Sequence, residues 1–229
     1  MPVYNEAATL EKMLDRLLAV EFPVSYEIVI VNDGSKDATA EILDAVDNPH
    51  VRVFHQPVNR GKGAAISRAA VEAAGEYMVV CDADEEYSPK EIPSLLEPVL
   101  AGEARVVFGT RSFGSHTSYS FWYVMGNKGV TLAANILFNA YISDLETCFK
   151  LMPLELYRSL KIKERGFGME AEVTAKLLAR GYRPYEVPIS YRARSREEGK
   201  KITAWDGVEA LWILLKLRIR EGSRRRPPE

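Results

Sequence analysis

The chain has 229 residues, of which 47% are hydrophobic, so it is long enough to form one large domain with a sizeable core. Its net charge of −2 and its pI of about 6.0 provide no overall attraction to nucleic acid, which we do not expect as a partner. The two cysteines, Cys81 and Cys148, form no CxxC or Cys/His cluster, which argues against zinc and redox sites and favours a reducing cytoplasm. The first residues do not resemble a signal peptide, and no apolar run reaches the roughly 18 residues of a spanning helix.

Strand-like and helix-like segments alternate along the chain, which predicts an α/β fold with a mostly parallel, Rossmann-like sheet flanked by helices. No strand pattern precedes Pro2, although a strand normally leads into the first turn of a nucleotide-binding sheet. Either the residues of that strand have been lost from the N-terminus, or the fold has no first strand. The expected strands are residues 27–31, 51–55, 76–81, 104–110, 147–152 and 183–191. The expected helices are residues 6–20, 61–74, 169–180 and 205–220, with one more around residues 42–46.

Residues 119–142 are apolar and aromatic on both sides of a polar break at residues 126–129. This pattern predicts two helical pieces that lie against the core or a membrane. Residues 204–220 have the pattern of an amphipathic helix, and residues 221–229 have the composition of a disordered tail. We therefore expect a single domain over residues 1–220, followed by the tail.

Asp82 and Asp84 follow an apolar run, at the carboxyl end of a predicted strand, where open α/β sheets bind their ligands. Two carboxylates one residue apart repel each other unless a cation or hydrogen-bond donors join them. Hard oxygen ligands of this kind suit Mg²⁺ or Mn²⁺ that bridges a diphosphate. For these residues alone, a solvated acidic turn before a helix at Pro89 is the better interpretation. Their position after a buried strand makes the two interpretations about equal.

Asp33 also leaves a buried strand, in the sequence NDGS, where it could bind a nucleobase or ribose. Capping of the next helix by Asp33 or Ser35 is at least as good an interpretation. Residues 59–63, NRGKG, open a helix, and the amides of a helix start beside Arg60 and Lys62 favour an anion. The segment does not match a Walker loop, and no GxGxxG follows the first strand, which argues against a dehydrogenase.

Four motifs in order, PVYNE at residues 2–6, VNDGS at 31–35, NRGKG at 59–63 and DAD at 82–84, together resemble glycosyltransferase family 2, with its GT-A fold. The resemblance extends to about residue 212 and is closest to dolichol-phosphate mannosyltransferases and bacterial polyprenyl-phosphate glycosyltransferases. It implies an inverting, metal-dependent enzyme that moves one hexose from a nucleotide-diphosphate sugar, of GDP-mannose or UDP-glucose type, to a polyprenyl or dolichyl phosphate. The QxxRW signature of processive synthases is absent, which favours transfer of a single sugar.

The resemblance also implies roles for individual residues. Asp82, Asp84 and Glu86 would hold Mg²⁺ or Mn²⁺, and Asp84, Arg111 and Asp144 are the candidate catalytic residues. Arg111 would lie near the phosphates, and Asp144 would be the base if the acceptor were a hydroxyl. The nucleotide pocket would be formed by Pro2, Tyr4, Glu6, Asp33, Lys62, Asp82 and Ala83. The acceptor phosphate would be met by a set of cations, about half of which we expect to be solvated surface: Lys128, Lys150, Arg192, Arg194, Arg196, Lys200 and Lys201.

The family pattern D-x-T-S-G-F-R reads DLETCFK at residues 144–150. Asp144, Phe149 and Lys150 fit this pattern, whereas Glu146 and Cys148 depart from it. Residues 196–201 resemble the basic R-x-x-G loop that closes over phosphates in the family.

The apolar segments 119–142 and 204–220, with the arginines that follow, suit peripheral binding at the inner face of a membrane. Ordinary core packing is an equally good interpretation of the first segment and a slightly better one of the second. Three alternatives for the function remain: a family 2 enzyme with a soluble or saccharide acceptor, a sugar-phosphate nucleotidyltransferase, whose usual Gly-rich opening loop is not matched, and a non-catalytic nucleotide-binding protein associated with a membrane.

Overall fold

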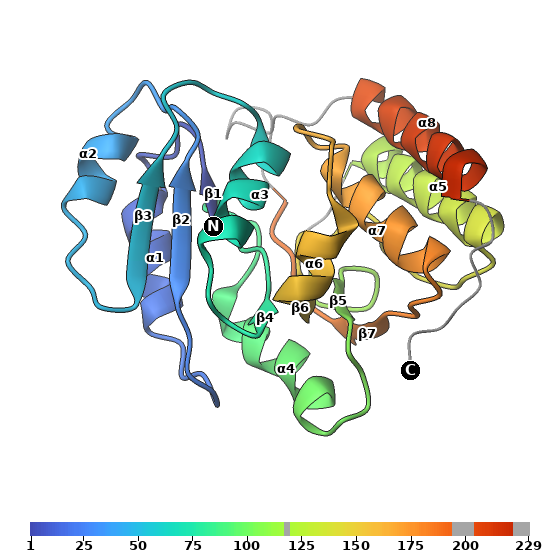
Figure 1. Ribbon diagram of the computed structural model, residues 1–229, viewed down its shortest axis with the longest axis horizontal. Coiled ribbons are helices and arrows are strands. Elements are labelled where there is room, and N and C mark those ends of the chain that lie inside the picture. Colours follow the sequence, from blue (N-terminus) through green and yellow to red (C-terminus); the bar gives the residue numbers. More distant parts are fainter. Residues whose placement is uncertain (117–119, 194–203, 222–229) are drawn as a thin grey trace.

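Two sheets form the centre of the fold in a computed structural model that describes residues 1–116, 120–193 and 204–221 (Figure 1). The first sheet is parallel, in the order β1 (Pro2–Val3), β2 (Ile28–Asn32), β3 (Val51–His55). In the second sheet β6 is antiparallel to both its neighbours, while β5 and β7 are parallel. The order of this second sheet is β4 (Tyr77–Met78), β6 (Lys150–Pro153), β5 (Val107–Thr110), β7 (Tyr185–Pro188).

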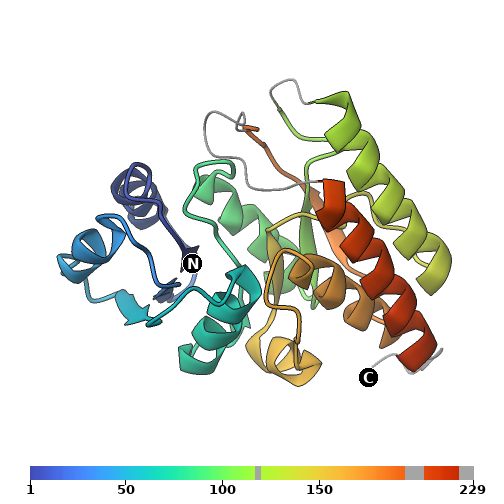
Figure 2. The same cartoon turned by 90° about the horizontal axis from the view of Figure 1, so that it is seen from above.

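Helices alternate with these strands, as the sequence predicted for an α/β fold. Figure 2 shows α5 and α8 side by side at the end of the molecule opposite α1 and α2. The helices of the described residues are α1 (Leu10–Leu18), α2 (Thr39–Asp44), α3 (Lys62–Glu72), α4 (Ile92–Leu100), α5 (Phe121–Phe138), α6 (Leu154–Leu160), α7 (Met169–Ala179) and α8 (Ala204–Glu221), with a 3₁₀ turn, η1 (Pro89–Glu91), before α4.

Burial explains why the central elements form. Every residue of β2 is buried, which is typical of a parallel strand covered on both faces. Helix α1 buries Leu10, Met13, Leu14 and Leu17, which are spaced to form one face. Helix α7 is buried along its whole length, although it carries three charged side chains that therefore need partners inside the protein.

The structure corrects three sequence-based expectations. Residues Pro2 and Val3 do form a strand, which pairs with β2 through Val31 and Asn32. Strand β4 covers Tyr77 and Met78 and not residues 76–81, and these two residues pair with Pro153 and Met152 of β6.

The third correction concerns α5, which is one continuous helix where we expected two pieces. Gly126 and Gly129 lie inside it, and a Cβ atom at either position would meet nothing within 4 Å. A helical glycine costs only about 1 kcal/mol, and the burial of Val130, Ala134 and Phe138 outweighs that cost.

Helix α8 covers the amphipathic segment expected at residues 204–220. Residues 222–229 of the expected tail lie outside the described residues. Among the helices that the structure describes, none is both long enough and apolar enough to cross a bilayer.

Candidate active site

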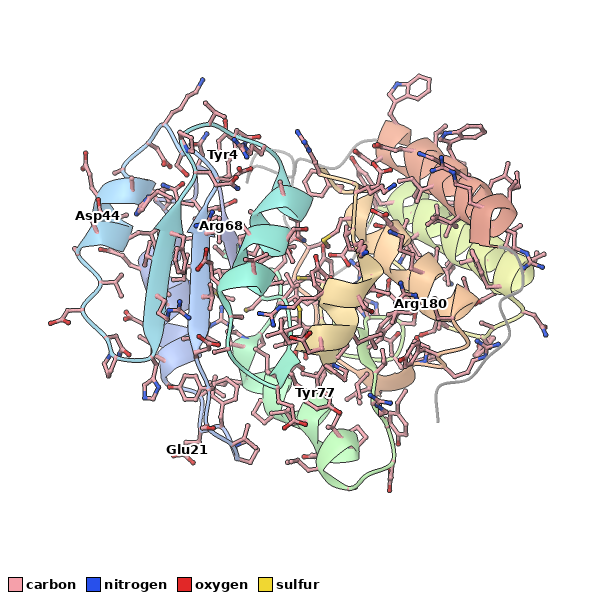
Figure 3. The ribbon with its side chains drawn as sticks, viewed as in Figure 1. Tyr4, Glu21, Asp44, Arg68, Tyr77 and Arg180 are labelled. Carbon is pink, nitrogen blue, oxygen red and sulfur yellow. The ribbon has the colours of Figure 1, made fainter. Side chains whose placement is uncertain are left out.

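A cavity of about 340 Å³ opens between the carboxyl ends of β1 and β2, the DAD segment after β4, and the start of α7. In Figure 3, Tyr4 marks the carboxyl end of the first sheet, while Tyr77 and Glu21 lie at the opposite end. A larger groove of about 630 Å³ lies between α3 and residues 162–165, and of the predicted motifs it contains only Arg60 and Gly63 of the NRGKG segment. Most of the predicted site lines the smaller cavity: Pro2, Tyr4, Glu6, Asp33, Lys62, Asp82, Ala83, Asp84, Glu86 and Arg111.

Asp33 holds the loop that opens α3. Its carboxylate accepts hydrogen bonds from the backbone amides of Arg60, at 2.8 Å, and Gly61, at 2.7 Å. In the first turn of α3, the amide of Gly63 donates a hydrogen bond to the carbonyl of Arg165 at 2.7 Å. The anion that we expected at this helix start is therefore Asp33 itself. The alternative role for Asp33, as the cap of the following helix, is wrong, because α2 begins at Thr39 without a side-chain cap.

The energetics of Asp33 follow from this position. The side chain is 2% exposed, and burial raises the pKa of Asp33, although the amides of Arg60 and Gly61 oppose that effect. Asp33 accepts a third hydrogen bond, from Gln56 Nε2 at 3.0 Å. Asp33 therefore fixes the wall of the cavity from within the fold.

Four charged side chains form a chain of ion pairs, three of them in the cavity lining and the fourth, Lys150, behind it. Lys62 Nζ lies 2.7 Å from Asp82 and 3.6 Å from Glu170, whose other oxygen lies 2.5 Å from Lys150. Although burial opposes the effect, Asp82 raises the pKa of Lys62 well above its ordinary value. Lys150 also donates to the carbonyl of Thr147 and is only 3% exposed. Lys150 is thus a partner of Glu170 behind the wall and does not line the cavity, contrary to its expected place at a phosphate.

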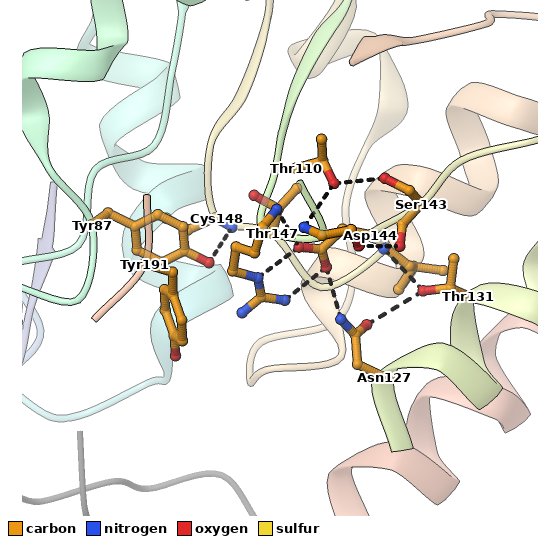
Figure 4. Close-up of polar contacts among 12 residues, drawn as sticks. Tyr87, Thr110, Asn127, Thr131, Ser143, Asp144, Thr147, Cys148 and Tyr191 are labelled. Atoms are coloured by element: carbon orange, nitrogen blue, oxygen red, sulfur yellow. Dashed lines mark hydrogen bonds and ion pairs between the residues drawn. The ribbon is translucent and has the colours of Figure 1, made fainter. Parts of the chain in front are cut away.

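Arg111 follows β5, lines the cavity and is held by Asp144. Figure 4 labels Asp144 and Asn127 within this network of hydrogen bonds. The guanidinium binds both oxygens of Asp144, at 2.6 and 2.7 Å, and Asn127 of α5 donates a further bond at 2.9 Å. Tyr191 lies under the guanidinium, with its ring centre 4.9 Å away. Burial acts to raise the pKa of Asp144, but Arg111 and its hydrogen bonds hold that pKa below its usual value.

These contacts correct the expected role of Asp144. A carboxylate that is 1% exposed, outside the cavity lining and engaged with an arginine cannot readily take a proton from an acceptor. Asp144 positions Arg111 instead, and Asn127 extends the same network to α5.

The three expected metal ligands are not assembled as a set. Within the described ranges, no group of three His, Cys, Asp or Glu side chains is placed to hold a metal ion. Asp82 is engaged by Lys62, and Glu86 accepts a hydrogen bond from the hydroxyl of Tyr191 at 2.7 Å. Asp84, whose carboxylate also accepts a hydrogen bond from the amide of Glu86 at 3.1 Å, is the principal ligand that the family resemblance implies. Magnesium beside phosphates commonly takes only one or two carboxylates and completes its shell with phosphate oxygens and water, so this donor set fits an ion that arrives with a diphosphate.

The remaining cations expected at the acceptor phosphate are scattered. Lys128 is exposed on α5, outside the cavity. Arg192 is exposed in a neighbouring groove of about 490 Å³, and its amide donates to the carbonyl of Glu86 at 2.9 Å. The other four lie outside the described residues: Arg194, Arg196, Lys200 and Lys201.

Sequence reasoning assigned no role to several residues that line the cavity, among them Glu146, Glu170, Tyr87, Phe167 and Tyr191. Burial raises the pKa of Glu146 to about 7. The departure of Glu146 from the pattern at residues 144–150 was a signal for its role. Glu170 carried no comparable signal, because Glu172 and Lys176 are charged residues of the same helix. Tyr87 and Tyr191 each adjoin a predicted site residue, Glu86 and Arg192, but no motif included the three aromatic residues themselves.

Two curated proteins are similar to most of this chain. The chain is 28% identical over 205 residues to the dolichol-phosphate mannosyltransferase of Pyrococcus furiosus, which covers 87% of this chain and 57% of that enzyme. It is 27% identical over 240 residues to the undecaprenyl-phosphate mannosyltransferase of Micrococcus luteus, covering 96% of this chain and 97% of that enzyme.

Among solved structures, glucosyl-3-phosphoglycerate synthase of Mycobacterium tuberculosis, in complex with Mn²⁺, uridine diphosphate and glucosyl-3-phosphoglycerate, superposes with a TM-score of 0.71. At 21% identity, over 94% of this chain and 77% of that one, this likeness shows the shared GT-A fold alone. The family model described as Glycosyl transferase family 2 matches residues 1–160. The chain therefore belongs to glycosyltransferase family 2.

Proposed function

We propose that the protein transfers one hexose, with inversion, from a nucleotide-diphosphate sugar of GDP-mannose or UDP-glucose type to a polyprenyl phosphate. The observation that carries the proposal is the cavity that gathers Asp84 and Arg111 with the residues expected to bind the nucleotide. Two relatives whose names specify lipid-phosphate acceptors support the choice of acceptor.

In the proposed reaction an oxygen of the acceptor phosphate forms a bond to the anomeric carbon of the sugar. The bond from that carbon to the diphosphate breaks at the same time, and its electron pair leaves with the nucleoside diphosphate. A phosphate is already an anion near neutral pH and needs no strong base, which fits the engagement of Asp144 with Arg111. Catalysis would rest on positioning and on stabilisation of charge.

Individual residues contribute to that stabilisation. Arg111 has a fixed guanidinium at the cavity, suited to phosphate oxygens. Asp84 would hold Mg²⁺ or Mn²⁺, and such an ion, when bound, would neutralise charge on the leaving diphosphate. Lys62 would act more remotely, because Asp82 already engages its ammonium group.

Binding at the surface of a membrane is also part of the proposal. Helices α5 and α8 lie side by side and expose large apolar side chains, including Trp122 and Trp205, which are both 79% exposed. An apolar face of this kind, with tryptophans, suits the boundary between lipid headgroups and acyl chains. A polyprenyl chain could then stay in the bilayer while its phosphate reaches the cavity.

The test is transfer of labelled sugar from GDP-mannose and UDP-glucose to polyprenyl phosphate with Mg²⁺ or Mn²⁺, for the wild type and Asp84→Asn. We expect labelled lipid from the wild type, and a loss on the order of 10²–10³-fold in the variant, because charge on the leaving group is no longer stabilised. Glu85→Gln is the matched control, since Glu85 neighbours Asp84 but pairs with Lys12 and Arg16 outside the cavity. Absence of labelled lipid with every donor would reject the lipid acceptor.

A further inference from the structure

Glu146 differs from the other carboxylates that line the cavity. Asp33 accepts hydrogen bonds from two backbone amides, and Asp82 and Glu170 are each paired with a lysine. No hydrogen bond or ion pair joins the carboxylate of Glu146 to any residue that the structure describes. The other carboxylates of the lining also accept hydrogen bonds from described groups: Glu6, Asp84 and Glu86.

The charged groups around Glu146 explain why it stays without a partner. Arg111 follows β5, Lys150 lies in β6, Glu170 in α7, and Asp144 in the loop of Glu146 itself. Both cations are already committed, Arg111 to Asp144 and Lys150 to Glu170. The two carboxylates add negative potential, so a half-buried Glu146 is poorly compensated when it is ionised.

This arrangement conflicts with a phosphate acceptor if Glu146 carries a charge. The acceptor phosphate would approach Arg111, and Glu146 lines the same cavity and senses the charge of Arg111. An ionised Glu146 would repel the phosphate oxygens, whereas a protonated carboxyl offers them a hydrogen-bond donor. The proton stays on Glu146 during transfer, because the attacking phosphate oxygen releases none.

We propose that Glu146 takes part as a neutral carboxyl that donates a hydrogen bond to the acceptor phosphate, and so controls binding of that phosphate beside Arg111. The proposal rests on the proposed function. Burial, together with Glu170 and Asp144, raises the pKa of Glu146 to about 7. The donor form is therefore present below about pH 7 and is lost as the pH rises through this value.

The experiment measures the KM for polyprenyl phosphate between pH 5.5 and 8.5 for the wild type, Glu146→Gln and Glu146→Ala. The wild-type KM should rise about tenfold per pH unit above pH 7, since one ionisation removes the donor. Glu146→Gln donates from its amide at every pH, so this rise should disappear. Glu146→Ala should show a raised KM throughout. Protonation of the acceptor itself affects all three enzymes equally and cancels in the comparison.

Unfolding by urea provides a readout that needs no activity. The folded pKa of Glu146 lies above its unfolded value, so the native state binds more protons between about pH 4.5 and 7 and loses stability as the pH rises through that window. Glu146→Gln should therefore match the wild type at pH 4 and unfold at a higher urea concentration at pH 8.

The outcomes separate the two proposals. Wild-type product with parallel pH profiles in Glu146→Gln would overturn the role of Glu146 alone. An inactive Glu146→Gln, with wild-type activity that rises with pH, would also overturn it, because Glu146 would then be a base. Equal urea midpoints of the wild type and Glu146→Gln at pH 8 would also overturn the role of Glu146. No lipid product from the wild type at any pH would reject the proposed function and this inference together.

Discussion

The wall of the cavity and the outer face of α5 and α8 differ in how their side chains are partnered. The wall buries carboxylates that have partners, whereas the outer face exposes large apolar side chains. In the wall, Asp33, Asp82 and Asp144 are buried or nearly so, and each has its partners within the fold. On the outer face, Trp122 and Trp205 are 79% exposed, and nothing described covers them. The wall is therefore arranged before any substrate binds. The outer face, in contrast, is not covered by any of the described residues and is open to a binding partner.

The same helices take part in both regions. Helix α5 buries Ala134 and Phe138 against α7 and α8, and its Asn127 reaches Asp144 in the wall. The same helix exposes Trp122 and Ile136, and Figure 2 shows it at the outer edge of the molecule. Substitutions can therefore test each region separately, through stability for the wall and through surface binding for the outer face.

Asp144→Asn should have the largest effect on stability. The substitution keeps the shape of the side chain but leaves the buried guanidinium of Arg111 without a counter-charge. We expect the free energy of unfolding to fall by about 3–5 kcal/mol, as is usual when one partner of a buried ion pair is removed. Urea unfolding measures this change, and sugar transfer should fall with it because Arg111 loses its fixed position.

The double variant Arg111→Met/Asp144→Leu is the control for this prediction. Replacing a whole buried ion pair by apolar side chains is commonly close to neutral, so the double variant should recover stability but not activity. An Asp144→Asn protein as stable as the wild type would show that the ion pair of Arg111 and Asp144 does not stabilise the cavity wall.

Asp33→Asn should have a smaller effect. One of the two amides of Arg60 and Gly61 would face an amide group that cannot accept its hydrogen bond. The expected cost is about 1–3 kcal/mol in the free energy of unfolding, with weaker binding of a nucleoside diphosphate because the loop shifts. Urea unfolding and calorimetric titration measure the two effects.

Asp37→Asn is a matched control for Asp33→Asn. Asp37 also accepts hydrogen bonds from two amides, those of Ala7 and Thr39, but it is exposed, and water can replace them. Its substitution should cost less. Equal costs at the two positions would mean that burial of Asp33 contributes nothing to the wall.

The sequence predicted where the site residues gather better than what they touch. Asp33 and Asp84, from two of the ordered motifs, and Arg111, after a predicted strand, line one cavity, because strand ends in an α/β fold meet at one edge. The partners came from distant segments: Asp33 binds amides about thirty residues later, and Asp144 lies 33 residues after Arg111. Spacing within a motif carries no information about such pairs, so the roles expected for Asp144 and Lys150 failed.

Replacing Trp122 and Trp205 by serine should have the smallest effect on stability, yet a clear effect on binding to vesicles. Both side chains are 79% exposed in the folded protein, so the free energy of unfolding should change by no more than about 0.5 kcal/mol. Sedimentation with vesicles that contain anionic phospholipid should show affinity lower by about tenfold or more, since two large apolar groups no longer leave water. Val58→Ser/Val71→Ser is the control, with two apolar residues 58% and 70% exposed far from α5 and α8.

If the tryptophan variant binds vesicles as well as the wild type does, the outer face does not meet lipid. Sedimentation equilibrium of both proteins would then show whether a second copy of the chain covers it, because self-association would weaken in the variant.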